Sequence, residues 1–272
     1  MSDIWAITAF KYAERNARTR ADSFLFADDH SGPHPMDYYI WLLECDGRRI
    51  LIDTGYDRAE GAARGRPIET PPEAMLATHG VAPETIETVV LTHLHYDHAG
   101  SLAAFPAAQL WVQEAEMAYA TGPCMCHDVL RMPFTGAHIC DMVRALYAGR
   151  VRFVSGSAEL APGVEVHLIG GHSRGLQAVR VRTRRGWVVL ASDASHFYEN
   201  FLGGQVFPIV ADVQDMLDGF ATLRRLADSD AHIVPGHDPL VRAAYPALGH
   251  GNAVALHVDP KPGLWDDNGR AI

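Results

Sequence analysis

Apolar runs of strand length alternate with polar and glycine-containing segments along most of the chain. Two of these runs, at 38–45 and 49–53, are joined by Asp46-Gly47, a pair typical of a tight hairpin turn. Further strands are predicted at 4–10, 88–91, 109–113, 151–154, 164–169, 176–183, 187–191 and 231–234. We therefore expect strands in both halves of the chain.

Helical periodicity is clearest at 213–227, where apolar residues recur every three or four positions. The apolar stripe consists of Met216, Leu217, Phe220, Leu223 and Leu226. Shorter helices are predicted at 71–79 and 114–120, whereas the basic segment 15–20 and the segment 58–70 predict solvated loops. The chain thus combines helical patterns with the strand patterns above.

The regular alternation breaks at 121–149, where glycine and proline are frequent. We expect a lid or a pocket wall there, as part of a single domain that covers residues 1–250. Residues 251–272 contain prolines and glycines without a regular apolar period, and they predict an irregular C-terminal tail.

Composition narrows the class of protein. With 272 residues, of which 48% are hydrophobic and 21% charged, the chain can bury a large core like an ordinary globular enzyme. The formal net charge of −10 argues against a nucleic-acid partner, because phosphate binding requires clustered Lys and Arg. No apolar run reaches the ~18 residues of a membrane span, and the first residues do not resemble a signal peptide. We therefore expect a cytoplasmic protein without a membrane partner.

The most informative stretch is 89–100, Val-Val-Leu-Thr-His-Leu-His-Tyr-Asp-His-Ala-Gly. A short apolar strand ends there, and four potential metal ligands follow: His93, His95, Asp97 and His98. Alternate side chains of an extended chain share one side, so several of these ligands can point the same way. Imidazole and carboxylate are ligand types that zinc and similar ions prefer. A buried histidine loop without a metal would leave desolvated imidazoles without partners, so this stretch predicts a metal site.

Three further candidates follow predicted strands beside glycine or serine, namely His172, Asp193 and His237. Each residue alone is weak evidence for a metal site, because a polar residue at a strand end often only stabilises the following turn. Their joint occurrence strengthens the metal hypothesis. Asp53 also ends a strand, and two roles stay open for it. It could cap the following turn, or it could hold a ligand histidine through a hydrogen bond.

Cys124, Cys126 and His127 invite a second metal hypothesis. Their spacing is not that of a zinc knuckle, and no second pair of ligands accompanies them. We therefore favour a lid or pocket wall built from Cys, Met and Phe side chains. Four cysteines in a chain of this length are also too few for a disulfide framework.

The ordered ligand set resembles that of the metallo-β-lactamase superfamily, over roughly residues 36–245. The resemblance implies an α/β fold of the αββα sandwich type, with two mixed β-sheets face to face and helices outside. It also implies two divalent metal ions, by default Zn²⁺, at one edge of the sandwich. In that pattern the first ion is held by His93, His95 and His172, the second by Asp97, His98 and His237, and both by Asp193. The pattern also makes Asp53 a support of the site.

Within the superfamily the chain is most similar to the N-acyl-homoserine lactone lactonases, through the complete ligand set and the Asp-Ala-Ser step at 193–195. Those enzymes usually place a tyrosine next, whose hydroxyl helps to hold the substrate carbonyl. Here that position is His196, and Tyr198 lies two residues further on. Either residue could replace the tyrosine. The implied substrate is an N-acyl-homoserine lactone or another small or aromatic lactone.

The resemblance implies ring opening by a hydroxide that bridges the two metals and attacks the ester carbonyl. Asp97 would carry the proton to the departing ring oxygen, and His196 or Tyr198 would support the developing oxyanion. We expect a substrate pocket formed by Phe105, Met132, Phe134, Phe197 and Phe201. The expected partner is a small-molecule lactone, and a homodimer is consistent with the frequent pairing of related lactonases.

Two alternatives use the same scaffold: thioester hydrolysis of the glyoxalase II type and β-lactam hydrolysis. Glyoxalase II relatives usually carry a basic, helical C-terminal domain, whereas this chain has a short tail after Pro246. A periplasmic β-lactamase would need an export signal. A non-catalytic metal-binding protein is a third alternative, but the seven ligand positions are all intact.

Overall fold

The computed structural model describes residues 3–26, 30–249 and 252–272. Its strands are β1 (Ala6–Arg15), β2 (Met36–Cys45), β3 (Arg48–Ile52), β4 (Thr88–Val90), β5 (Gln109–Gln113), β6 (Val151–Val154), β7 (Ser157–Ala161), β8 (Val164–Leu168), β9 (Gln177–Thr183), β10 (Gly186–Ser192), β11 (Ile233–Pro235), β12 (Ala247–Leu248) and β13 (Ala253–Ala255). Its α-helices are α1 (Arg58–Ala63), α2 (Pro72–Thr78), α3 (Glu114–Ala120), α4 (Asp128–Arg131), α5 (Gly136–Tyr147), α6 (Tyr198–Gly203), α7 (Val213–Leu226) and α8 (Leu240–Ala244).

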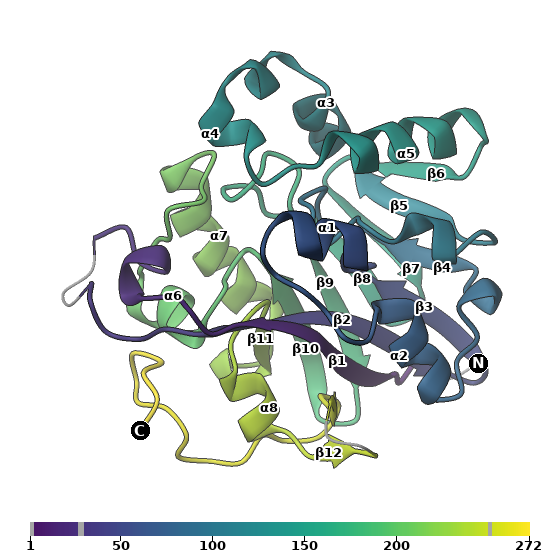
Figure 1. Ribbon diagram of the computed structural model, residues 1–272. Coiled ribbons are helices and arrows are strands. Elements are labelled where there is room, and N and C mark those ends of the chain that lie inside the picture. The colour runs from purple at the N-terminus through teal and green to yellow at the C-terminus, as the bar shows by residue number, and fades with distance from the viewer. Residues whose placement is uncertain (1–2, 27–29, 250–251) are drawn as a thin grey trace.

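The strands form two mixed sheets that face each other (Figure 1). The larger sheet has the order β12-β13-β1-β2-β3-β4-β5-β6, and the smaller one has the order β11-β10-β9-β8-β7. The predicted hairpin joins β2 to β3 through Asp46 and Gly47, whose φ angles of 49° and 76° suit a tight turn. The expected αββα architecture is thereby confirmed.

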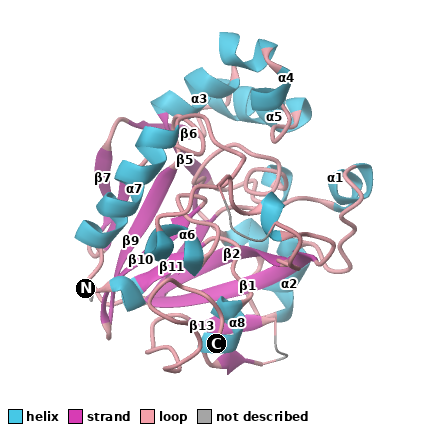
Figure 2. Cartoon of the chain, turned by 90° about the vertical axis from the view of Figure 1, so that its left-hand side faces the viewer, coloured by secondary structure: helices cyan, strands magenta, loops and turns pink. Residues whose placement is uncertain are grey.

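Strand β2 shows how the layers are built, because its side chains alternate between two hydrophobic clusters. Tyr39 and Trp41 point into the cluster that joins the two sheets. Tyr38 and Ile40 point into the other cluster, which contains residues of α2, α3 and α5 on the outer face of the larger sheet. Helix α7 packs against the smaller sheet through Met216, Phe220, Leu223 and Leu226 (Figure 2). Leu217, which was expected on the same stripe, is instead 44% exposed. Both faces of β2 are therefore buried, as its long apolar run indicates.

Several expectations need correction. The segment 58–70 contains helix α1 rather than loop alone, because Asp57 caps a helical turn by accepting a hydrogen bond from Glu60 N. The strand β7 was not expected; its residues Ser-Ala-Glu-Leu-Ala are half-buried or exposed and lie at the sheet edge. The tail is not wholly irregular, because β13 pairs with β1 and is buried. The expected boundary at residues 250 and 251 lies outside the described residues.

The excursion at 121–149 consists largely of α4 and α5, which lie at the top of Figure 1 above the strand ends. In the described part of the chain, no helix is both long and apolar enough to cross a membrane.

Candidate metal centre

The predicted ligand side chains all come from loops at one edge of the sandwich. Strand β4 leads into the loop with the first four ligands, while β8, β10 and β11 lead to the other three. Because β8 and β10 are both antiparallel to β9, and β11 is parallel to β10, these three strands end at the same edge. The ligands are His93, His95, Asp97, His98, His172, Asp193 and His237. Each of them is at most 7% exposed.

These side chains form two triads that could each hold a metal ion. Within each triad, the potential ligand atoms lie within 4.8 Å of one another. The triads are His93, His95 and His172 on one side, and Asp97, His98 and His237 on the other. In both triads two ligands come from the loop after β4 and one comes from the smaller sheet.

The carboxylate of Asp193 lies between the triads. Its Oδ2 is 3.2 Å from His172 Nε2 and 3.8 Å from His93 Nε2. Its Oδ1 is 3.2 Å from His98 Nε2 and 3.0 Å from His237 Nε2. One carboxylate therefore presents one oxygen to each triad, which is the geometry that a bridging ligand requires.

Three ligand histidines are oriented by their outer nitrogens. His98 Nδ1 donates to Asp53 Oδ2, and His172 Nδ1 and His237 Nδ1 donate to main-chain oxygens, all at 2.7 Å. The acceptors of the last two bonds belong to Ile209 and Asp37. Each Nε2 therefore faces the centre of the cluster, which is the orientation that metal ligation requires.

Several inner atoms of the cluster lack hydrogen-bond partners among the described residues. These buried atoms are His93 Nε2, His98 Nε2, His237 Nε2 and Asp193 Oδ1. Buried polar atoms are rarely left this way in proteins unless another partner occupies the site. Burial also lowers the pKa of His93 and of His95 well below its usual value, so both rings are neutral. Neutral imidazoles and orphaned inner atoms fit a pair of metal ions.

Asp53 is placed as a support of this cluster. Besides the bond from His98, its carboxylate accepts hydrogen bonds from Thr92 N at 2.7 Å and Thr92 Oγ1 at 2.8 Å. Its φ angle of 60° lies in the left-handed region, which is uncommon for a residue other than glycine. The structure thus shows Asp53 holding a candidate ligand histidine through a hydrogen bond, which is the second of the two roles that the sequence left open.

A second buried acid, Glu116 on α3, was missed by the sequence analysis. Its carboxylate accepts hydrogen bonds from Leu94 N, Ser173 Oγ and Gly175 N, at 2.8–2.9 Å. It thereby connects the loop of His93 and His95 with the loop of His172. In the sequence it looks like an ordinary acidic residue in the first turn of a helix, so no local signal distinguishes it.

His196 lies against the cluster, with its Nε2 at 2.9 Å from Asp193 Oδ2. Its ring stacks on Phe207 at a centroid distance of 3.7 Å. Tyr198, the alternative catalytic candidate, points elsewhere, because its ring stacks on Trp265 at 4.1 Å inside the cluster between the sheets. The expectation of a catalytic role for Tyr198 is corrected, since α6 begins there and turns the side chain into the core.

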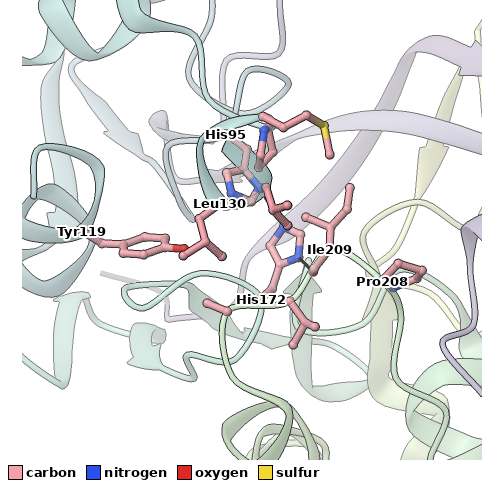
Figure 3. A pocket seen from close by; sticks show the side chains of 11 residues that line it. His95, Tyr119, Leu130, His172, Pro208 and Ile209 are labelled. Carbon is pink, nitrogen blue, oxygen red and sulfur yellow. Dashed lines mark hydrogen bonds between the residues drawn. The ribbon is translucent and has the colours of Figure 1, made fainter. Parts of the chain in front are cut away.

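A hollow of about 40 Å³ opens beside the first triad (Figure 3). Figure 3 shows His95 and His172 at one side of it and the hydroxyl of Tyr119 directed toward them. Its lining residues are His95, Tyr119, Val129, Leu130, Met132, Pro133, His172, Pro208, Ile209, Val210 and Ala211. The segment 121–149 thus supplies part of the wall.

The five expected pocket residues divide into two groups. Met132 lines the hollow, Phe134 lies 4.5 Å from the His95 ring between centroids, and Phe197 packs between His34 and His196. Phe105 and Phe201 are instead fully buried in the two hydrophobic clusters, so their assignment to the pocket was wrong. Phe105 follows a 3-10 turn and Phe201 lies inside α6, and both side chains pack beneath these elements.

The cysteine segment shows no second metal cluster among the described residues. Cys124 is half-buried and Cys126 is exposed, and both are free thiols in a short 3-10 helix.

Comparison with known proteins agrees with this geometry. Residues 35–237 match the family model of the metallo-beta-lactamase superfamily. An N-acyl homoserine lactonase from Bacillus cereus is 30% identical over 178 residues, which cover 60% of this chain and 66% of the relative. The match thus spans slightly less than two thirds of that relative.

Solved structures share the fold. An N-acyl homoserine lactone hydrolase with the product N-hexanoyl-L-homoserine at its catalytic metal center superposes with a TM-score of 0.73 at 24% identity, covering 89% of this chain and 96% of that chain. The dizinc quorum-quenching lactonase AidC superposes with a TM-score of 0.67 at 17% identity, covering 88% and 90%. The resemblance expected from the ligand pattern is confirmed: the chain belongs to the metallo-beta-lactamase superfamily.

Proposed function

We propose that this protein is a lactonase that holds two divalent ions, by preference Zn²⁺, and opens the ring of a small lactone. The observation that carries the proposal is the position of Asp193, whose two carboxylate oxygens face two separate triads of buried ligands. The triad of His93, His95 and His172 would hold the first ion. Asp97, His98 and His237 would hold the second.

When bound, two such ions lower the pKa of a shared water toward neutrality and polarise an ester carbonyl. The protein's own side chains complete the reaction. Asp97 is the most exposed of the seven ligands, at 7%, and is therefore nearest to incoming substrate. Its carboxylate would deliver the proton to the ring oxygen as the C–O bond breaks. Water thus adds its OH to the carbonyl carbon and its proton to the alkoxide.

His196 would serve the substrate carbonyl in place of a tyrosine. Its Nε2–H donates to Asp193 Oδ2 at 2.9 Å, which places the imidazole where the two triads meet. With the Asp193 carboxylate engaged by the ions, this N–H would be shared with a carbonyl oxygen beside it and would stabilise the negative charge that develops there. Stacking on Phe207 holds the ring in this orientation.

Lactone hydrolysis is favoured over thioester or β-lactam hydrolysis because the Bacillus cereus relative and the superposed structures are named as homoserine lactone lactonases or hydrolases. Those names support an N-acyl-homoserine lactone or a related ring as the substrate.

The test is hydrolysis of a panel by metal-analysed protein. The panel contains acyl-homoserine lactones of several chain lengths, plain γ- and δ-lactones, an aromatic lactone, a thioester and a β-lactam. We expect selective lactone turnover, two metal ions per chain, and loss of turnover in His93→Ala and Asp193→Ala. Removal of metal by a chelator should abolish turnover, and added Zn²⁺ should restore it. Cleavage of the thioester or the β-lactam alone would overturn the proposal.

A further inference from the structure

Arg18 belongs to the N-terminal loop that runs beside α6 (Figure 1), where Arg20 pairs with Glu199. The basic segment 15–20 was expected to be a solvated loop, yet Arg18 is only 6% exposed. Its Nη2 donates to the main-chain oxygen of Asp22 at 2.8 Å. Its Nε and Nη1 are buried and have no hydrogen-bond partner among the described residues. Three of the five N–H bonds of this guanidinium therefore have no acceptor in that part of the chain.

The neighbouring carboxylates are already bound by other groups. Asp22 uses its side chain to accept a hydrogen bond from Thr19 N at 2.9 Å. Glu199 on α6 forms two hydrogen bonds with Arg20, at 2.9 and 3.1 Å, and one with Arg270. Among the described residues, no carboxylate lies within 4.0 Å of the Arg18 guanidinium. The loop thus pairs Arg20 with an acid and leaves Arg18 without one.

The surroundings of Arg18 connect it to the metal centre. Its Cζ is 5.8 Å from the ring centroid of Phe197, the residue that follows His196. Burial lowers the pKa of Arg18, Tyr38 and Asp22 oppose the shift, and the charges of Arg15 and Arg66 add to it, so that the pKa is about 10. Arg18 therefore stays charged at neutral pH and lies close enough to Arg66 and Tyr38 to interact with both.

Tyr38 and Arg66 connect the surroundings of Arg18 with the candidate ligands through side-chain contacts. The ring of Tyr38 lies 5.1 Å from the ring of His237, and its hydroxyl lies 3.2 Å from that of Tyr96. Arg66 Nη1 donates to the Tyr96 hydroxyl. A guanidinium with open donors, a second guanidinium and two tyrosine hydroxyls thus lie beside the second triad.

A purely aliphatic substituent would leave this buried charge uncompensated, which is unfavourable in a desolvated site. A carboxylate would accept the open N–H bonds of Arg18 and neutralise its charge. We propose that Arg18, assisted by Arg66, binds a carboxylate on the substrate, so that the preferred substrate is a lactone with an anionic substituent rather than a neutral one. This inference rests on the proposed lactonase function and specifies its substrate class.

The test compares two lactones that differ in the charge of one substituent, γ-butyrolactone-3-carboxylate and its methyl ester. We expect the wild-type kcat/KM to favour the carboxylate by about 10- to 100-fold, the range for hydrogen bonds to a charged group. Arg18→Met should abolish the preference, and Arg18→Lys should retain part of it. Arg184→Met, which removes the same charge from an exposed turn, should leave the preference unchanged.

Binding provides a readout that is independent of turnover. The lactam 5-oxopyrrolidine-3-carboxylate and its methyl ester are titrated calorimetrically into the wild type and the three variants. Tighter binding of the acid, lost in Arg18→Met, would support the subsite even if no lactone were opened, in which case the proposed function alone would fail. Lactone turnover with equal preference for acid and ester would overturn the inference and leave the function intact. Because the wild-type comparison needs no variant, a folding defect in Arg18→Met cannot conceal the result.

Discussion

His98 Nδ1 donates a 2.7 Å hydrogen bond to Asp53 Oδ2, although the two residues are 45 positions apart in the sequence. The same carboxylate accepts two hydrogen bonds from Thr92, which immediately precedes His93. Asp53 therefore fixes both the ring of one ligand and the start of the loop that carries four of them.

The substitution Asp53→Asn should weaken metal binding by about 10- to 100-fold, because an amide is a poorer acceptor for His98 and no longer raises the basicity of the ring. Competition with a chromophoric chelator measures this affinity. Asp46→Asn, the same change in the hairpin turn between β2 and β3, is the control and should bind metal like the wild type. Equal affinities in the two variants would show that the His98 bond does not support the site.

Removal of the Glu116 carboxylate should destabilise the metal-free protein. Glu116→Ala leaves Leu94 N and Gly175 N buried without an acceptor, so we expect the free energy of unfolding to fall by about 3 kcal/mol or more. Urea denaturation measures the change. Glu114→Ala, on the exposed side of the same helix, should alter stability by less than ~0.5 kcal/mol. A small loss for Glu116→Ala would contradict its role between the two loops.

The substitution His196→Phe separates packing from hydrogen bonding. The phenyl ring keeps the stack on Phe207, but the N–H next to Asp193 is lost. We expect kcat to fall about 100- to 1,000-fold with little change in KM or in metal content, as for loss of one oxyanion donor. Steady-state kinetics with metal analysis of each preparation check this. A variant with wild-type kcat would remove His196 from the proposed mechanism.

Because of the ion pairs of Glu199, the free energy of unfolding should depend on pH under acidic conditions. Burial alone would raise the pKa of Glu199, but hydrogen bonds from His34 and Arg20 outweigh it and lower the pKa to about 2, from 4.5. The folded state thus favours the ionised carboxylate of Glu199. Its contribution to the free energy of unfolding is therefore complete above pH 4.5 and is lost as the pH falls toward 2.

The contribution of Glu199 at neutral pH is on the order of 3 kcal/mol. The measurement is the difference in unfolding free energy between the metal-free wild type and Glu199→Gln as a function of pH. This difference should shrink between pH 4.5 and 2. A difference that stays constant over this interval would show that the charge of Glu199 is not stabilised by its partners.

The strands and the candidate ligands could be predicted because their signals are local, whereas the sandwich fold followed from the resemblance of the ordered ligands to the superfamily. The candidate ligands lie in loops that follow short apolar strands, and four of them occur within one loop, so spacing alone brings those four together. The alternation of Tyr39 and Trp41 with Tyr38 and Ile40 likewise follows from strand geometry.

The residues that the sequence analysis missed or misplaced depend on distant partners. Glu116 and Arg18 look like surface charges, and their burial becomes visible only when segments far apart in the chain are packed together. The direction of Tyr198 depends on Trp265, from a tail whose contact with α6 has no local signal. Such long-range contacts produce no periodic pattern of residues that could be recognised in the sequence.

Each triad takes two ligands from the loop after β4 and one from the smaller sheet. Neither sheet alone can therefore complete either site, and a bound ion joins the two sheets across the edge of the sandwich. An ion that leaves must give up ligands carried by both sheets. The rate of metal exchange should therefore depend on the relative motion of the two sheets at this edge.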